Sequence, residues 1–403
     1  MRVAVVISRL SQLVTWEPVL RALAPEHEAI LVLDPTLEGS PKDDQVPTRR
    51  RLPDRIALFA EVRECAGRDL VPSLAWLRAD WIVWTYVPGL DAAQLRETCK
   101  SRLGHLQASW SDFMMLGTGA TSISPSWPAS APQARNFQAL PDRIWGWGTS
   151  WPRWWGDFSG LAGAERDLAQ AELTRRFVAV GHPHLDHLAW IDRDAARKAL
   201  GGALPERYVL YLPFPQRITR AGWWSHGLYS GPWPWAGERW AVRALGQWAY
   251  ARGWGLVVKV RSKEGVVPSW LLRAADRLVG DRSGEPTMIE LLAAGAALVV
   301  HHCSATAAEA WGAGVPAACV TPPRPSAWSP YATRLSHPDF APSYRPGFYG
   351  WPLPGGHGLP PARLDDPAAV TDDASEYRRR FLSVGLGVGA RIVEDMERLS
   401  ERG

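Results

Sequence analysis

The stretch that decides the fold, residues 297–320, reads ALVVHHCSATAAEAWGAGVPAACV. Its apolar start predicts a buried strand of a parallel sheet. A tight turn of small residues follows, and Ser304 and Thr306 stand where a helix is expected to begin. Two glycines let that helix end, and Pro316 prevents it from continuing into the next apolar run. The stretch therefore predicts a strand, a helix and a second strand.

The beginning of the predicted helix is a candidate phosphate site. The hydroxyls of Ser304 and Thr306, with Ala305 between them, would stand beside the free N–H groups of the first turn. Glu309 follows within about one turn, close enough to reach a ribose hydroxyl. We therefore interpret the stretch as a nucleotide diphosphate site at the carboxyl edge of a parallel sheet. The alternative is an ordinary strand–helix–strand unit in which Ser or Thr only caps the helix.

The length and composition of the chain indicate a globular protein of two domains. Its 403 residues exceed what one core usually holds, and a net charge of +4 is too weak to indicate a nucleic-acid partner. The four cysteines lack paired short spacing, which favours a reduced intracellular protein over a disulfide framework or a zinc site. No apolar run approaches the roughly 18 residues of a membrane span. We expect a cytoplasmic protein, with peripheral contact at the inner face of the membrane left open.

Strand-like apolar runs alternate with helical segments along the chain, which is typical of parallel α/β sheets. The predicted strands are 2–7, 29–33, 80–85, 104–108 and 143–148 in a first series, and 177–180, 208–212, 256–260 and 296–300 in a second. Helices are predicted near the C-terminus over 376–382 and 388–402. We expect an N-terminal domain over 1–170, a C-terminal domain over 171–375, and C-terminal helices over 376–403.

A histidine-rich turn opens the second series. Residues 181–188 read GHPHLDHL, where Gly181 permits a close chain reversal just past a strand and Pro183 fixes it. The alternative for its three histidines is a surface turn, and as a zinc site the ligand set is incomplete.

Two cations stand together at the end of a later strand. Lys259 and Arg261 are two residues apart, so strand alternation puts both on one face. At a strand's carboxyl end such a pair would neutralise a diphosphate, which Arg grips with two hydrogen bonds. The alternative is a pair of solvated charges.

The order of these motifs resembles the GT-B superfamily of nucleotide-sugar enzymes. The closest likeness is to CDP-glycerol glycerophosphotransferase-like and surface-polysaccharide transferases, with UDP-N-acetylglucosamine 2-epimerase as a relative. The resemblance covers residues 177–320. It is carried by Gly-x-Pro-x-x-Asp at 181–186, Lys-x-Arg at 259–261, Ser-x-Thr-x-x-Glu at 304–309 and Gly-x-Pro at 314–316.

The resemblance implies the GT-B architecture, an α/β fold of two Rossmann-like parallel-sheet domains facing a cleft. The C-terminal helices would cross back to brace the N-terminal domain, the nucleotide donor would lie against the C-terminal domain, and the acceptor against the N-terminal one. The residues implied in donor binding are Gly181, His182, Lys259, Arg261, Ser304, Ala305, Thr306 and Glu309. No cofactor is implied, and metal is not expected, because cations and a helix N-terminus take the place of a divalent ion in this fold.

The catalytic base is expected in the N-terminal domain. The segment GHLQASWSD, residues 104–112, is similar to the His-x-Glu-Ala-Gly segment of the 2-epimerases. Gln107 stands where their carboxylate stands, and an amide cannot take a proton, which disfavours an epimerase. His105 or Asp112 is the candidate general base toward an acceptor hydroxyl. The alternatives are a satisfied histidine at a strand edge and an aspartate that only caps a helix.

Ser8 and Arg9, in the loop after the first strand, and Gln107 are the candidate acceptor-binding residues. The alternative for that loop is helix capping.

The leading functional hypothesis is a glycosyltransferase or glycerophosphotransferase. It would move a sugar or polyol phosphate from a nucleotide-sugar or nucleotide-polyol donor to a hydroxyl of a glycan, lipid-linked or small-molecule acceptor, in surface glycan or glycoconjugate synthesis. The alternatives are a UDP-sugar 2-epimerase and a non-catalytic protein that binds a nucleotide-sugar.

Overall fold

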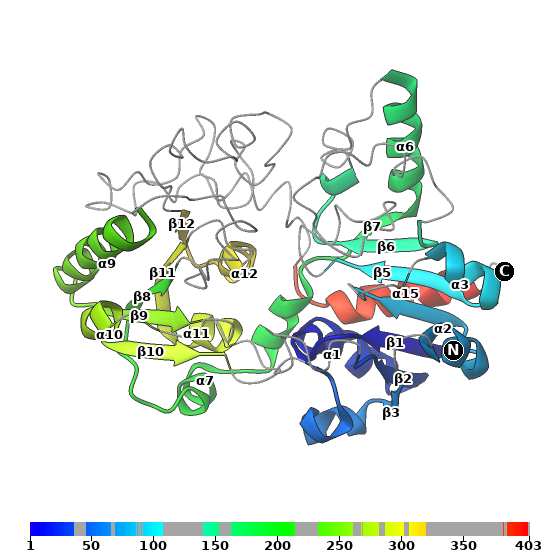
Figure 1. The fold of residues 1–403 in the computed structure, drawn as a ribbon, viewed down its shortest axis with the longest axis horizontal. Helices are drawn as coiled ribbons and strands as arrows, with labels where there is room; N and C mark the ends of the chain where they lie inside the picture. The colour runs from blue at the N-terminus through cyan, green and yellow to red at the C-terminus, as the bar shows by residue number, and fades with distance from the viewer. Residues whose placement is uncertain are drawn as a thin grey trace. The chain divides into compact units, whose positions relative to one another are not determined.

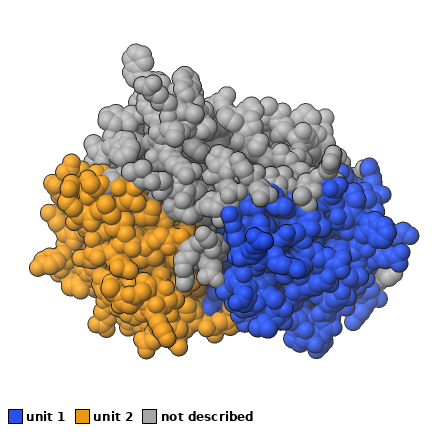
Figure 2. Space-filling model, turned by 60° about the horizontal axis from the view of Figure 1, so that its bottom comes forward, with its two compact units in different colours: residues 1–187, 283–286, 380–403 blue, residues 188–282, 287–379 orange. Residues whose placement is uncertain are grey.

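The computed structural model describes residues 1–35, 46–65, 69–85, 87, 90, 92–107, 140–152, 163–213, 233–260, 267, 269–281, 287–301, 306–319, 382 and 385–401. The chain divides into two compact units, coloured separately in Figure 2. Unit 1 comprises residues 1–187, 283–286 and 380–403, and unit 2 comprises residues 188–282 and 287–379.

Unit 1 is built on a parallel sheet of strand order β3-β2-β1-β4-β5-β6-β7 (Figure 1). Its strands are β1 (Arg2–Ile7), β2 (Glu28–Leu33), β3 (Glu61–Glu64), β4 (Trp81–Trp84), β5 (Arg102–Leu106), β6 (Arg143–Gly146) and β7 (Phe177–Ala179). Its helices are η1 (Leu10–Gln12), α1 (Leu13–Leu23), η3 (Arg49–Arg51), η4 (Asp54–Leu58), α2 (Leu70–Leu77), α3 (Ala92–Thr98), α6 (Gly163–Arg176) and α15 (Val388–Ser400), and η8 (Pro183–Ala189) spans the division between the units.

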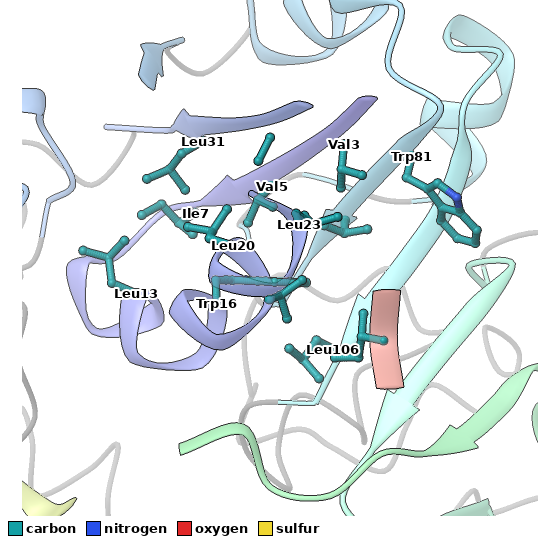
Figure 3. Packing of buried hydrophobic residues seen from close by; sticks show 14 of the residues in the cluster. Val3, Val5, Ile7, Leu13, Trp16, Leu20, Leu23, Leu31, Trp81 and Leu106 are labelled. Atoms are coloured by element: carbon teal, nitrogen blue, oxygen red, sulfur yellow. The ribbon is translucent and has the colours of Figure 1, made fainter. Parts of the chain in front are cut away.

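Burial on both faces explains why β1, an inner strand of unit 1, is apolar from Val3 to Ile7. In β1, Val3, Val5 and Ile7 join a core with α1 and α15, which includes the fully buried Trp16 (Figure 3). The alternate residues of the same strand pack into a second core with α2 and α3. A parallel strand covered by helices on both sides shows this continuous apolar pattern, in place of alternation with polar residues.

The second strand series was predicted to begin at Phe177, but that strand is the edge strand of the first sheet. β7 pairs with β6, with Ile144 opposite Phe177. The Phe177 ring lies over Gly146, where a Cβ would come within 2.3 Å of it. Unit 1 therefore extends to residue 187, where the sequence placed the boundary at 170/171. The pairing of β7 is long-range, and the alternation of strands and helices carries no information on which sheet a strand joins.

Unit 2 is built on a second parallel sheet, of strand order β10-β9-β8-β11-β12 (Figure 1). Its strands are β8 (Tyr208–Leu212), β9 (Gly255–Val260), β10 (Arg277–Gly280), β11 (Ala296–His301) and β12 (Ala317–Cys319). Its helices are α7 (Arg193–Ala199), α9 (Trp233–Tyr250), α10 (Ser269–Ala274), α11 (Met288–Gly295) and α12 (Thr306–Gly312).

The two faces of the second sheet are covered by different helices. Side chains of α9 and α10 pack with Val209 and Tyr211 on one face. Tyr208, which alternates with them, donates a hydrogen bond from its hydroxyl to the Leu291 carbonyl of α11 at 2.5 Å. This places α11 on the opposite face, and Figure 1 shows α12 on that same side.

The C-terminal helix α15 belongs to unit 1, where it packs against α1. Its bounds agree with the helix predicted over 388–402, whereas the predicted helix over 376–382 lies outside the described residues, except for Leu382. Among the helices that the structure describes, none combines the length and the apolar character needed to cross a lipid bilayer.

Candidate functional site

The order of the strands in unit 2 reverses at β8. From β8 the chain adds β9 and β10 on one side of it, and then β11 and β12 on the other. Such a reversal separates the loops that follow the neighbouring strands and leaves a crevice at their carboxyl ends, where open α/β sheets bind ligands. The carboxyl edge around β8, β9 and β11 is therefore the candidate ligand site of unit 2.

Lys259 and His301 lie in one row across this edge. Val258 pairs with Tyr211, so the next position of β9, Lys259, is level with Leu212, and Leu212 pairs with His301. Residues level with one another in a parallel sheet point to the same face, and these two are separated by two strand spacings, about 10 Å. Their face is opposite to the one packed against α9 and α10.

His301 was not predicted as a site residue, although it is fully buried at the very end of β11. The signal available in the sequence was its place as the first polar residue after the apolar run of the strand. Arg261, predicted to act beside Lys259, lies outside the described residues.

Lys259 is buried and forms an ion pair with Asp281, with 2.5 Å between Nζ and Oδ1. Asp281 directly follows β10, the neighbour of β9, and its N–H donates to the Val260 carbonyl. Thr287 donates to the same Oδ1 from its backbone N–H at 3.3 Å and from its hydroxyl at 3.4 Å. The ammonium of Lys259 is therefore paired with Asp281, and the Asp281 carboxylate accepts hydrogen bonds from Thr287, the residue preceding α11.

The helix after β11 has the bounds that the sequence indicated. α12 begins at Thr306 and ends at Gly312, and Gly314 adopts a left-handed backbone with φ of 75° that allows the chain to turn into β12. Glu309 lies in the first turn and is buried. Ser304 and Ala305, two of the predicted donor-binding residues, lie outside the described residues.

The corresponding reversal in unit 1 falls between β1 and β4, and Gln12 occupies it. Its side-chain oxygen accepts from the backbone N–H groups of Ser8 at 2.7 Å and Arg9 at 3.0 Å, and its amide donates to the Thr85 hydroxyl at 2.7 Å. Ser8 is fully buried, and Arg9 is the residue that precedes η1. The geometry gives the loop the capping role that the sequence left open, and it adds Gln12, which sequence reasoning missed.

His105 is 3% exposed at the carboxyl end of β5, and its imidazole packs edge-on against Trp84. Burial lowers its pKa to about 3, although a hydrogen bond with the Thr85 backbone acts in the opposite direction. Its Nδ1 has no hydrogen-bond partner in the described part of the chain. At neutral pH the ring is therefore uncharged and Nδ1 is able to accept a hydrogen bond. Asp112, the other candidate base, lies outside the described residues.

Gln107 holds the chain that follows β6. Its side-chain oxygen accepts from the Trp147 backbone N–H at 3.2 Å, and its backbone carbonyl accepts from the Trp147 indole at 2.8 Å. The side-chain nitrogen makes no hydrogen bond within the described residues. The side-chain oxygen of Gln107 thus has a structural partner in a fully buried place.

The histidine-rich turn belongs to unit 1. Gly181 has a φ of 97°, a conformation that favours glycine. The ring of His182 stacks on Trp147 with 4.2 Å between centroids, and burial holds its pKa well below the usual value. The backbone N–H of His184 donates to Nδ1 of His182 at 3.3 Å, and the Nε2 of His184 lies 3.0 Å from the Thr15 hydroxyl. The surface turn considered as an alternative is therefore wrong for His182, which is buried.

The comparisons with known proteins concern structure alone, since the sequence matches no protein-family model and no curated protein. UDP-GlcNAc 2-epimerase from Neisseria meningitidis, bound to UDP-GlcNAc, is 11% identical with a TM-score of 0.54, over 98% of this chain and 99% of that one. The wall teichoic acid polymerase TagF is 12% identical with a TM-score of 0.54, over 99% and 90% of the two chains. The UDP-GlcNAc 2-epimerase of Methanocaldococcus jannaschii, in complex with UDP-GlcNAc and UDP, is 12% identical with a TM-score of 0.52, over 100% of both.

These similarities define the class of fold: each of the two units is a parallel α/β sheet, and the chain as a whole has the GT-B fold. The fold class predicted from the sequence is confirmed.

Proposed function

We propose that this protein transfers a sugar or a polyol phosphate from a nucleotide-activated donor to a hydroxyl acceptor. The observation that carries the proposal is the buried Lys259 at the carboxyl edge of unit 2, one strand away from the reversal point of the sheet. A fixed ammonium at such an edge is suited to a diphosphate, because it supplies charge and up to three hydrogen-bond donors.

In this proposal the donor lies along the carboxyl ends of β8, β9 and β11. Lys259, with Arg261, binds the diphosphate, and Ser304, Ala305 and Thr306 bind it from the other side. Glu309 accepts hydrogen bonds from the ribose hydroxyls, a role consistent with a buried carboxylate in the first turn of α12. Two structures of similar fold are complexes with UDP-GlcNAc, and this similarity of fold supports a nucleotide-sugar as the donor here.

Unit 1 would receive the acceptor. His105 is the candidate general base in the proposal, because its ring is neutral and its Nδ1 is able to accept a hydrogen bond from an acceptor hydroxyl. Ser8, Arg9 and Gln107, in the same unit, would position the acceptor.

The first experiment measures the melting temperature of the protein with UDP, CDP, GDP, dTDP, CMP and their sugar or polyol conjugates. A ligand that binds only the folded state raises the melting temperature according to its affinity. We expect a shift with one nucleotide series, retained in EDTA and lost in Lys259→Ala and Glu309→Ala. Lys198→Ala, which removes an exposed ammonium from α7 of the same unit, is the matched control. A protein that shifts with none of these ligands would contradict the proposal.

A 2-epimerase is the second candidate, favoured by the similarity to two UDP-GlcNAc 2-epimerase structures. Gln107 counts against it, since an amide cannot exchange a proton with the substrate. Incubation of the protein with UDP-GlcNAc in the absence of any acceptor separates the two: formation of a second epimer supports the epimerase, and transfer that occurs only with an acceptor supports the transferase.

A further inference from the structure

We infer that the carboxylate of Asp281 pairs with the ammonium of Lys259 while the donor is absent, and that the donor's diphosphate displaces it. Asp281 thereby sets the affinity of the site for the diphosphate. This inference rests on the proposed function of Lys259, and it assigns a positioning residue that neither the motifs nor the resemblance indicated.

The two side chains are brought together by the pairing of β9 with β10. Lys259 is level with Val279, and Asp281 is the first residue after β10, so both stand at the carboxyl edge of the sheet. Their charged atoms are 2.5 Å apart, and the side chains are 7% and 21% exposed, respectively. The contact is thus a short ion pair in which the ammonium is more buried than the carboxylate.

An ammonium buried to this extent needs an anion next to it. Leaving such a charge unpaired is strongly destabilising, so the ligand-free site requires the carboxylate of Asp281. A diphosphate brings more negative charge than a carboxylate does and satisfies the same ammonium. Both anions cannot lie on one ammonium without like-charge repulsion, which is why the bound donor is expected to replace Asp281 there.

Asp281 has partners besides Lys259. The Thr287 N–H and hydroxyl donate to the same oxygen that faces Lys259, and the hydroxyl also lies 3.4 Å from the Gly280 carbonyl. A carboxylate released by Lys259 therefore keeps hydrogen bonds from the residue that precedes α11.

The test is the binding of UDP and CDP by calorimetry, with uridine and cytidine as uncharged probes. The variants are Asp281→Asn, Lys259→Met and the two combined. Asp276→Asn is the matched control, because it removes one carboxylate at the amino end of β10 in the same unit. We expect Asp281→Asn to bind the diphosphate about tenfold more tightly, equivalent to about 1.4 kcal/mol, while its affinity for the nucleoside changes less than about twofold and its melting temperature without ligand falls.

The combined variant distinguishes displacement of Asp281 from Lys259 from simple repulsion between Asp281 and the diphosphate. If Asp281 acts through Lys259, the gain from Asp281→Asn disappears in the Lys259→Met background, because no ammonium is left to release. A gain that persists there, or equal or weaker binding by Asp281→Asn while Lys259→Met still loses affinity, overturns the inference and leaves the proposed function standing. A parent protein that binds neither diphosphate overturns both.

Thr287→Val provides a second route should Asp281→Asn fail to fold. It removes the hydroxyl that helps to hold the carboxylate and leaves both charges in place. We expect diphosphate affinity to fall about twofold to threefold with nucleoside affinity unchanged. Equal loss of affinity for diphosphate and nucleoside would indicate a structural role only and would overturn the inference.

Discussion

Asp186 caps the helix that contains Gly389. One carboxylate oxygen accepts from the backbone N–H of Gly387 at 2.7 Å and the other from that of Gly389 at 3.1 Å. The aspartate of the Gly-x-Pro-x-x-Asp turn thus satisfies two N–H groups at the beginning of α15, 201 residues away from its first partner. The motif read as part of the donor domain is the anchor of the C-terminal helix on unit 1.

Replacement of Asp186 by Ala should lower the free energy of unfolding by about 2–3 kcal/mol. The carboxylate is buried, so its loss leaves both N–H groups without an acceptor, which costs more than the loss of an exposed cap. Asp192 is the control: it accepts from the Ala195 N–H at the start of α7 in an exposed place. Asp192→Ala should cost about 1 kcal/mol or less. Denaturation by urea measures both, and equal losses would contradict the expectation.

Gly389 should not tolerate even a methyl group. A Cβ at this position would lie 2.1 Å from the Pro18 carbonyl oxygen of α1, and a backbone atom cannot turn aside as the end of a side chain can. We expect Gly389→Ala to destabilise the protein by about 2 kcal/mol or more, since α15 must shift away from α1. At Gly385, a Cβ would meet nothing within 4 Å, so Gly385→Ala serves as the control with little change. Similar melting temperatures for the two variants would show that the helices separate freely.

The sequence was informative where local pattern decides the structure. β1 from Val3 to Ile7 and β11 from Ala296 to Val300 are apolar because helices cover both faces of each sheet, and the glycines after Trp311 end α12 where expected. What could not be predicted depends on contacts between distant segments. Sheet membership of Phe177 depends on its pairing with Ile144. The partner of Lys259 was unforeseen because Asp281 stands on another strand.

The candidate site shows the same division. The types of residue and their order placed Lys259 and Glu309 at the carboxyl edge of one parallel sheet, which local pattern suffices to predict. Gln12 and His301 were missed because a single glutamine or histidine after an apolar run has no spacing that marks it. They are candidates because they lie beside the reversal of strand order, which is a property of the sheet topology.

The stability of the protein should fall as the pH drops below about 6.5. The pKa of His105 is about 3 in the folded protein against 6.5 as its ordinary value, so between these values the unfolded chain binds a proton that the folded chain does not. One such group lowers the free energy of unfolding by about 1.4 kcal/mol per pH unit. His182, whose pKa is also lowered by burial, acts in the same direction. In His105→Asn, the free energy of unfolding, measured by urea denaturation between pH 4 and 6, should depend less steeply on pH, by about 1.4 kcal/mol per pH unit, the contribution of one proton. An unchanged slope would contradict the assignment.

A carboxylate at position 107 should destabilise the protein as the pH rises. Gln107→Glu retains an oxygen to accept from the Trp147 N–H, but the position is fully buried, and burial raises the pKa of a carboxyl. The unfolded carboxyl ionises near pH 4.3. Above that pH the unfolded chain releases a proton that the folded one keeps, so the variant loses stability relative to the parent from pH 4 to 7, by about 2 kcal/mol or more. Gln94→Glu, on the exposed side of α3, should show no such trend. A variant as stable as the parent at pH 7 would show that position 107 accommodates an ionised carboxylate and would contradict the expectation.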